Sequence, residues 1–450
     1  MAQDRCTDMT QGSVFRHVLV FTFPLLIGNL FQQFYNLVDS LVVGNFVGAN
    51  ALASVGTCGS LSYLIFAMSS GLSVGLGVMA AQAFGAKNTG EIRKIISGGI
   101  YILAGAGIIV SILFYLLAPN LLHLLQTPDT ILPDAVTYLR LICLGTVPVA
   151  LYNGIAAILR SMGDSKTSLY FLIAASLTNV VLDLVFVLGF RMGVFGVGLA
   201  TLISQIVSFV ISLVYALTKV PYFRLNREEL RPDLQIIGRA LILGVPVAAQ
   251  TSIISISAIV LQGVVNSFGE TVMAAYTVVD RVEQIVQQPY TSLGTALTSF
   301  AGQNIGAQRL DRVKKGFQVS VYLALGFSLI LLPIAYLFGP QIVGIFVKDP
   351  EVIATGARAL RIDSLFYFAL GMIYVPRSIL NGCGDSAFAM INGVTEVVCR
   401  IVYSNIFTRI PTIGRWGIWI TTGFTWGTTA LVCLHRYFKG KWRRMFDTAQ

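Results

Sequence analysis

Aspartates inside long apolar segments are the side chains of this sequence best placed to do chemistry. Asp39 lies in one such segment and Asp183 in another, and Asn179 precedes Asp183 by four residues, on the same face of a helix. A carboxylate in hydrocarbon costs roughly 3 kcal/mol or more unless it is paired, hydrated or protonated, so such a residue is a functional candidate by default. The three residues predict a cation-exchange site. The alternative is an ordinary hydrogen-bonded aspartate near a membrane boundary.

A second group of polar residues lies in the other half of the chain. Asp280, Glu283 and Gln284 fall in one apolar segment, and Asp363 lies in a later one. The first group could line a substrate cavity, or its acids could pair locally with Arg281. Asp363 is a candidate second cation site.

Two further patterns have both a structural and a functional interpretation. Glu396 and Arg400 stand at i and i+4, and we interpret them as an internal salt bridge. Met68, Met273 and Met372 could line a promiscuous cavity, because thioether side chains repack around varied shapes. Packing within the core is the alternative for each methionine.

Several catalytic classes are excluded by missing motifs. The sequence has no Walker A pattern, no HExxH and no CxxC pair. Gly71-Leu-Ser-Val-Gly75 matches the hydrolase pattern G-x-S-x-G, but it lies within an apolar segment, and Ser73 has no obvious base. We interpret these glycines as a close helix contact. The sequence therefore predicts neither an enzyme nor a bound cofactor.

The composition is that of an integral membrane protein. Of the 450 residues, 55% are hydrophobic and only 12% are charged, about half the charged fraction of a soluble domain. The net charge of +10 comes from basic residues between apolar runs. This pattern favours a membrane protein within a lipid bilayer over a nucleic-acid partner.

Twelve segments are long and apolar enough to cross a membrane. Alternate connections carry 22 Lys and Arg against 7 on the other side, which predicts that both termini are cytoplasmic. Trp416 and Trp419 are then expected at the outer interface and Trp442 at the inner one. The predicted spans are 14–43, 50–80, 94–117, 132–158, 167–190, 196–218, 236–264, 271–300, 316–338, 352–379, 388–409 and 415–437.

The chain repeats itself at an offset of 221 residues. AAQAFGAKNTGEIRK at 80–94 aligns with AGQNIGAQRLDRVKK at 301–315, and ILRSMGDS at 158–165 aligns with ILNGCGDS at 379–386. Six spans per repeat predict two parallel six-helix lobes, 1–222 and 223–450, related by a pseudo-two-fold axis along the membrane normal. This all-α architecture is typical of an alternating-access transporter.

The repeat also compares the two halves residue by residue. Asp39 corresponds to Val260, and Asp183 corresponds to Ser404. Asn179 corresponds to Arg400. The acidic pair is absent from the second half, so the fold itself does not require it.

At these residues the chain resembles the multidrug and toxic compound extrusion (MATE) family over nearly its whole length. The resemblance rests on FPLLIGNLFQQFYNLVDSLVVGNFVGANALASVG at 23–56, on ILRSMGDSK at 158–166 and on the paired AQ/GQ-x-x-GA motifs. It is nearest to the branch with a carboxylate pair in the N-lobe. The acid that other members carry in helix 7 is missing, since 240–264 contains none.

The resemblance implies cation-coupled export and a set of coupling residues. It maps them onto Asp39, Asn179, Asp183 and Thr201, which could also bind Na⁺ directly, and adds Asn153 and Tyr35 as neighbours.

Taken together, these patterns predict a secondary antiporter. We expect a monomer in the inner membrane of a prokaryote that exports small, often cationic, organic amphiphiles in exchange for H⁺ or Na⁺. The alternative is a flippase for a lipid-linked saccharide with the same architecture. That function would favour more Arg or Lys within the spans, for pairing with pyrophosphate.

Overall fold

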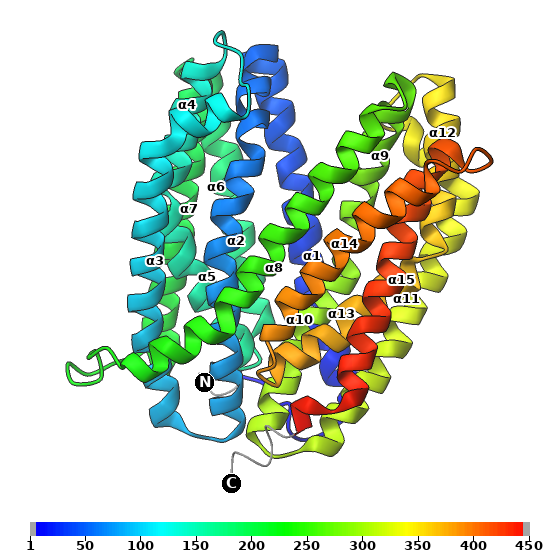
Figure 1. The fold of residues 1–450 in the computed structure, drawn as a ribbon. Helices are drawn as coiled ribbons and strands as arrows, with labels where there is room; N and C mark the ends of the chain where they lie inside the picture. Colours follow the sequence, from blue (N-terminus) through cyan, green and yellow to red (C-terminus); the bar gives the residue numbers. More distant parts are fainter. Residues whose placement is uncertain (1–5, 444–450) are drawn as a thin grey trace. The chain divides into compact units, whose positions relative to one another are not determined.

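The computed structural model describes residues 6–443, apart from the side chains of Ile256, Ile259 and Lys441, and this part of the chain is helical without strands. Its helices reproduce the predicted order (Figure 1). Eight helices are each long and apolar enough to cross a membrane, and two bent pairs raise the number to as many as ten. Each of the twelve predicted spans coincides with a helix or with a helix pair broken at a short turn.

The chain divides into two compact units, of which the first comprises residues 1–8 and 24–248. Within it, α2 packs on α5 and α3, and α6 packs on α7. Two hydrophobic clusters fill the unit, one around Leu76 and Met79 and the other around Cys58 and Leu139. Its elements are α1 (Val14–Val42, shared with the second unit), η1 (Val43–Val47), α2 (Ala49–Gly85), α3 (Thr89–Leu124), α4 (Leu132–Leu144), α5 (Thr146–Ser161), α6 (Ser165–Leu184), η2 (Val185–Gly189), α7 (Gly193–Lys219), η3 (Pro221–Phe223) and the first part of α8 (Leu234–Asn266).

The second unit comprises residues 9–23 and 249–450. Within it, α10 packs on α13, α11 on α12 and α14 on α15. Its elements are the start of α1, the rest of α8, α9 (Glu270–Val286), α10 (Gln288–Gly306), α11 (Leu310–Gly344), α12 (Pro350–Ser364), α13 (Tyr367–Gly382), α14 (Ala387–Phe407), η4 (Gly414–Trp416), α15 (Gly417–Lys439) and η5 (Lys441–Arg443).

The boundary between the compact units lies later than the lobe boundary predicted at 222/223. It falls inside α8, between Ala248 and Ala249, and a second crossing falls inside α1 before Pro24. Both helices carry a proline there, Pro24 in α1 and Pro246 in α8. A proline removes a helix hydrogen bond and bends the axis. Each helix therefore passes from one unit to the other beside its proline.

Residues 9–12 are held in the second unit by one arginine. The Arg312 guanidinium donates to the carbonyl oxygens of Met9, Gln11 and Gly12 at 2.8–3.1 Å, while Gln303 accepts from the Met9 N–H. Both side chains come from the second copy of the repeated 301–315 motif, which explains why the start of α1 belongs to this unit.

The repeat is visible in the backbone. Residues with positive φ recur in pairs 221 apart: Lys87 and Gln308 at 57° and 56°, Gly163 and Gly384 at 90° and 93°. Gly48 and Gly269, and Gly193 and Gly414, form two more such pairs. Left-handed backbone is costly for most residues, so matched occurrences mark equivalent turns in the two halves.

Two of the helix breaks follow the same spacing. Gly145 separates α4 from α5 at a bend of 43°, and the equivalent Phe366 lies in the break between α12 and α13, at 48°. The pairs α4–α5 and α12–α13 therefore each take the place of one predicted span.

The polar connection predicted at 219–239 is shorter in the structure, because α7 extends to Lys219 and α8 begins at Leu234. Arg93 donates to Glu229 at 2.8 Å, and Arg239 pairs with Glu91 at 3.3 Å. A hydrogen bond from the Asn226 N–H, together with Arg93, lowers the pKa of Glu229. The connection is thus folded onto the first unit.

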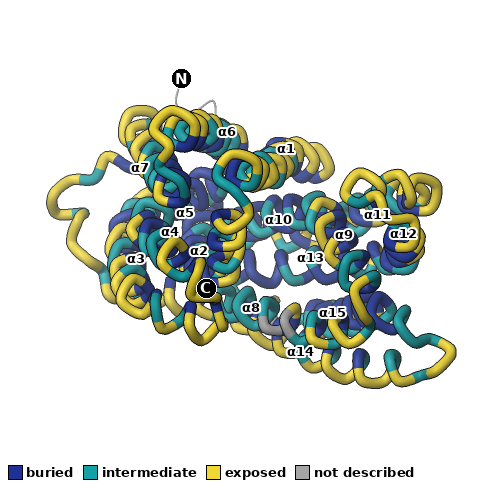
Figure 2. Tube along the Cα trace, turned by 90° about the horizontal axis from the view of Figure 1, so that it is seen from above, coloured by how far each residue is buried: buried dark blue, intermediate teal, exposed yellow. Residues whose placement is uncertain are grey.

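Apolar side chains cover the outward faces of the long helices. Ile109 and Leu116 on α3 are each 67% exposed, and Leu337 on α11 is 68% exposed. Figure 2 colours stretches of both helices as exposed. Such continuous apolar exposure is unfavourable in water and is expected against lipid. The chain is therefore a multi-pass membrane protein.

The hydrolase-like pattern is a packing feature, as expected. A Cβ atom added to Gly71 would overlap Ala248, and one added to Gly75 would overlap the backbone of Gly244. Ser73 donates its hydroxyl to the Ser69 carbonyl oxygen. The glycines thus let α2 and α8 approach closely.

Candidate cation and substrate sites

The two aspartates of the first unit lie just before two π-helical turns. Asp39 is four residues before η1, and Asp183 is two residues before η2. The two π-helical turns contact each other. Single π-helical turns occur frequently at functional sites because they redirect the side chains beside them.

The carboxyl groups of Asp39 and Asp183 lie within hydrogen-bonding reach of each other. Asp183 is only 1% exposed, and Asp39 is partly buried. In each residue, Oδ1 is buried and receives no hydrogen bond. Two carboxylates this close repel each other unless one carries a proton or a cation lies between them. The arrangement therefore has the chemistry of a cation-binding dyad.

Asn179 joins the dyad to its surroundings. With its amide oriented to satisfy its neighbours, Nδ2 donates to Asp183 Oδ2 at 2.9 Å and to the Tyr35 hydroxyl at 3.1 Å. Its oxygen accepts from the backbone N–H of Thr201 at 3.3 Å. Asn179 is 1% exposed. The structure thus brings Tyr35, Asn179, Asp183 and Asp39 together, as predicted from the sequence.

Two other residues of the predicted set are placed differently. The Thr201 hydroxyl donates to the Val197 carbonyl oxygen at 3.0 Å, so only its backbone N–H takes part in the cluster. Asn153 lies on α5, and its buried Nδ2 has no hydrogen-bond partner. Neither side chain is joined to the aspartates by a hydrogen bond in the part of the chain that the structure describes.

Sequence reasoning missed Tyr138 of α4. It is 8% exposed and lies close enough to Asp39, Tyr35 and Asp183 to interact with them electrostatically. Tyrosines are common in this sequence, and no local motif distinguishes this one. Only the packing of α4 reveals it.

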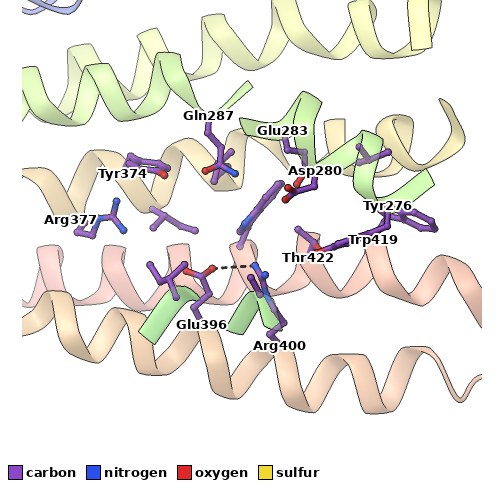
Figure 3. A pocket seen from close by; sticks show the side chains of 16 residues that line it. Tyr276, Asp280, Glu283, Gln287, Tyr374, Arg377, Glu396, Arg400, Trp419 and Thr422 are labelled. Carbon is purple, nitrogen blue, oxygen red and sulfur yellow. Dashed lines mark hydrogen bonds and ion pairs between the residues drawn. The ribbon is translucent and has the colours of Figure 1, made fainter. Parts of the chain in front are cut away.

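The second unit contains a cavity of about 180 Å³, lined by α8, α9, α13, α14 and α15 (Figure 3). Its charged lining residues are Asp280 and Glu283 on α9, Arg377 on α13, and Glu396 and Arg400 on α14. Trp419, Trp426 and Tyr276 add aromatic surface. The lining therefore combines acidic, basic and aromatic side chains around one cavity.

The polar residues predicted within 271–300, namely Asp280, Glu283 and Gln284, lie on α9 and differ in what they contact. Asp280 and Glu283 line the cavity of the second unit, and their role in a substrate cavity stays a prediction. Gln284 does not line it but donates to Asp280 Oδ2 at 2.9 Å. The alternative, a local ion pair with Arg281, is not formed in the described residues.

Asp363, on α12, lies next to Glu283. It is fully buried, and neither carboxyl oxygen receives a hydrogen bond from an N–H or O–H donor. The Glu283 carboxyl lies within hydrogen-bonding reach of it. The second unit therefore contains a second pair of buried carboxyl groups, one from α9 and one from α12.

The predicted salt bridge between Glu396 and Arg400 is confirmed, at 3.2 Å. Arg400 is 9% exposed, and its Nε has no hydrogen-bond partner. Arg377 lies over the Tyr374 ring at 4.6 Å, and its guanidinium donates to the Asn392 amide oxygen at 3.5 Å. Sequence reasoning did not select Arg377 because it stands near the end of a span.

The predictions for the tryptophans are in part wrong, and those for the methionines are not met at this cavity. Trp419 and Trp442 are buried, at 1% and 0% exposure, so their prediction as interfacial anchors is wrong. Trp419 contributes to the cavity wall instead, and Trp442 donates to the Tyr437 carbonyl oxygen. Met68 is exposed and Met372 buried, and neither these two nor Met273 lines this cavity. Their place in a central cavity stays a prediction.

In residues 6–443, no group of three or more His, Cys, Asp or Glu side chains is arranged to hold a metal ion. A Na⁺ ion at the first dyad would need amide, hydroxyl or main-chain oxygens beside the two carboxylates.

Comparison with known proteins agrees with this architecture. The MatE family model matches residues 24–185 and 246–406, two segments that coincide with the internal repeat. The chain is 29% identical over 442 residues to the "Probable multidrug resistance protein YpnP" of Bacillus subtilis, covering 97% of this chain and 98% of that protein. It is 23% identical to the "Multidrug export protein MepA" of Staphylococcus saprophyticus, covering 90% and 91% of the two chains.

Solved structures share the fold. A MATE structure in complex with MaL6 superposes with a TM-score of 0.92 at 22% identity, over 97% of this chain and 98% of that chain. A multidrug resistance MATE family transporter in an outward-facing conformation gives 0.92 at 22% identity, with 98% of each chain covered. Because the family model matches most of its length, in two segments that repeat each other, this chain belongs to the MatE family of membrane transporters.

Proposed function

We propose that the protein is a secondary active antiporter that exports organic, often cationic, amphiphiles in exchange for H⁺ or Na⁺ by alternating access. The observation that carries this proposal is the Asp39–Asp183 pair, in which two buried carboxyl groups share a hydrogen-bonding distance and each leaves one oxygen without a donor. Such a pair is stable only with a proton or another cation, so it exchanges cations with its surroundings.

Asn179 makes the pair sensitive to its charge state. Its amide donates to the Asp183 carboxylate and to Tyr35, and its oxygen accepts from the Thr201 N–H within α7. Loss or gain of a cation changes which oxygens need donors, so the α6–α7 contact responds. Coupling follows when the cation prefers one conformation of the transporter, because equal affinity for both would shift nothing.

The acids Asp280 and Glu283 and the surrounding aromatic side chains support a cationic head group as substrate. The two arginines of this cavity do not favour the lipid-linked pyrophosphate of the flippase alternative, because Arg400 is paired with Glu396 and Arg377 stacks on Tyr374. Relatives named as multidrug resistance or export proteins support the same choice. The distribution of Lys and Arg supports a cytoplasmic position for both termini. The bacterial relatives support the inner membrane of a prokaryote, where we propose that the protein acts as a monomer.

The test is drug transport in proteoliposomes under separately imposed H⁺ and Na⁺ gradients. Asp39→Asn and Asp183→Asn should each reduce gradient-driven export to the level of empty liposomes while leaving drug binding to the purified protein within a few-fold. Asp363→Asn, which also removes a buried carboxylate, is the matched control and should retain most export. Transport by both first-unit variants at the wild-type rate would refute the proposal.

A further inference from the structure

The two units differ at one repeat position in a way that assigns a role to Arg400. Asn179 and Arg400 are 221 residues apart, the same offset that relates the matched left-handed turns. Each side chain is buried inside its own unit. Asn179, on α6, is 1% exposed, and Arg400, on α14, is 9% exposed. The first unit therefore has a neutral amide where the second has a fixed positive charge.

Arg400 lies among carboxyl groups from three helices. It donates to Glu396 on its own helix at 3.2 Å, and it lies within electrostatic reach of Glu283 on α9 and Asp363 on α12. Tyr276 of α9 is the other titratable neighbour. Figure 3 shows Arg400 joined to Glu396 at the cavity, with Asp280 and Glu283 on the facing helix.

The carboxyl groups beside Arg400 have few other partners. Asp363 has two oxygens without a donor, and Glu283 has one. Among the described salt bridges, the one between Arg400 and Glu396 is the only pair in this cluster. A buried acid cluster attracts any cation that can reach it, and a side chain attached to the protein is always present at high local concentration.

We propose that the Arg400 guanidinium is a tethered cation that occupies, in the second lobe, the place an exchangeable cation takes in the first. A guanidinium group keeps its positive charge in proteins, so the Glu283–Asp363 pair does not need an exchangeable H⁺ or Na⁺ as a counter-charge. Positive charge beside Glu283 and Asp363 also repels Na⁺. The inference rests on the proposed cation exchange at Asp39 and Asp183, and it extends that function by restricting coupling to one lobe.

The test counts cations bound per molecule in the purified full-length protein. Saturation binding of radioactive Na⁺ and an acid–base difference titration cover the two coupling ions. Arg400→Gln should bind one cation more than wild type, and Arg400→Gln combined with Asp363→Asn should return to the wild-type number. Arg400→Lys keeps the tethered charge and should match wild type. Arg409→Gln changes an exposed arginine of the following turn and should also match.

The reciprocal substitution tests the idea without removing Arg400. Asn179→Arg should place a tethered cation beside Asp39 and Asp183 and abolish cation binding there. An unchanged cation number in monodisperse Arg400→Gln, or full cation binding in Asn179→Arg, would overturn the inference. Failure of the proposed function is distinguishable, because it would leave wild-type cation binding intact in Asp183→Asn.

Discussion

Helix α6 of the first unit and helix α14 of the second occupy equivalent repeat positions and end differently. Helix α6 carries Asn179 and Asp183 and passes into the π-helical turn η2, whereas α14 carries Arg400 and Ser404 and remains α-helical to Phe407. Ser404 is fully buried and donates to the Ile401 carbonyl oxygen of its own helix. Of these two helices, the one with the irregular end carries a carboxyl group, Asp183, and its Oδ1 is buried and receives no hydrogen bond.

The turns at Gly163 and Gly384 are equivalent in the two repeats, but the aspartates that follow them make different contacts. Gly163 and Gly384 adopt matching left-handed conformations, and each is followed by an aspartate. Asp164 caps α6 and contacts the Tyr215 hydroxyl, whereas Asp385 accepts two hydrogen bonds from Arg436, which stands 221 residues after Tyr215. The repeat thus retains backbone geometry and allows the interacting side chains to differ in charge.

The largest effect is expected from Asn179→Leu. The change removes the hydrogen bonds that the amide donates to Asp183 and Tyr35, and it removes an acceptor for the Thr201 N–H. A hydrogen bond to a charged group contributes about 1.5–3 kcal/mol. Because this bond stabilises the ionised Asp183 carboxylate, its loss should raise the proton affinity of the pair by roughly 10- to 100-fold. The measurement is the cation concentration needed for half-maximal drug export in proteoliposomes.

Asn153→Leu is the control for this change, since it makes the same substitution in the same unit at an amide whose Nδ2 has no partner. It should alter the half-maximal cation concentration by less than threefold. Equal effects at the two positions would mean that Asn179 acts through packing rather than through the dyad.

The helical frame could be predicted from the sequence because apolar length and repeat spacing are strong signals. Each predicted span overlaps a helix, and the pairing of Asp39 with Asp183 follows from their matched depth in helices that run the same way. The i, i+4 spacing of Glu396 and Arg400 also sufficed to predict their salt bridge.

Contacts between distant helices could not be predicted in this way. Tyr138 and Arg377 reach their sites through the packing of α4 and α13, and neither has a local pattern that marks it. Trp419 shows the opposite error: position near a span end suggested an interface, but the close packing of α15 against α13 and α14 buries it. The bends at α4–α5 and α12–α13 were also hidden, since each pair reads as one apolar run.

A smaller effect, on the free energy of unfolding, is expected from substitutions of Asp385 and Asp164, which follow the equivalent turns of the two repeats. Asp385→Asn removes a two-bond ion pair whose side chains are 10% and 22% exposed, and it leaves Arg436 partly buried without its partner. The expected loss is about 1–3 kcal/mol. Asp164→Asn should cost less than about 1 kcal/mol, because asparagine caps a helix as well as aspartate does. Thermal unfolding in detergent measures both. A larger loss at Asp164 would show that its contact with Tyr215 outweighs the second unit's ion pair.

The smallest effect is expected from Thr201→Val. The resemblance implies that Thr201 is a coupling residue, whereas in the structure its hydroxyl is bonded within its own helix. The Thr201 hydroxyl donates to Val197 within α7, and only the backbone N–H of Thr201 reaches Asn179. Valine keeps that N–H, and the hydroxyl that it removes donates only within α7, so drug export should stay within about twofold of wild type under an H⁺ gradient. Under a Na⁺ gradient the same variant reports on coordination, because a hydroxyl that leaves Val197 to bind Na⁺ would make its loss costly. Unchanged export under both gradients would confine the coupling site to Asp39, Asp183 and Asn179. A tenfold loss under Na⁺ alone would identify Na⁺ as the coupling ion and the hydroxyl as one of its ligands.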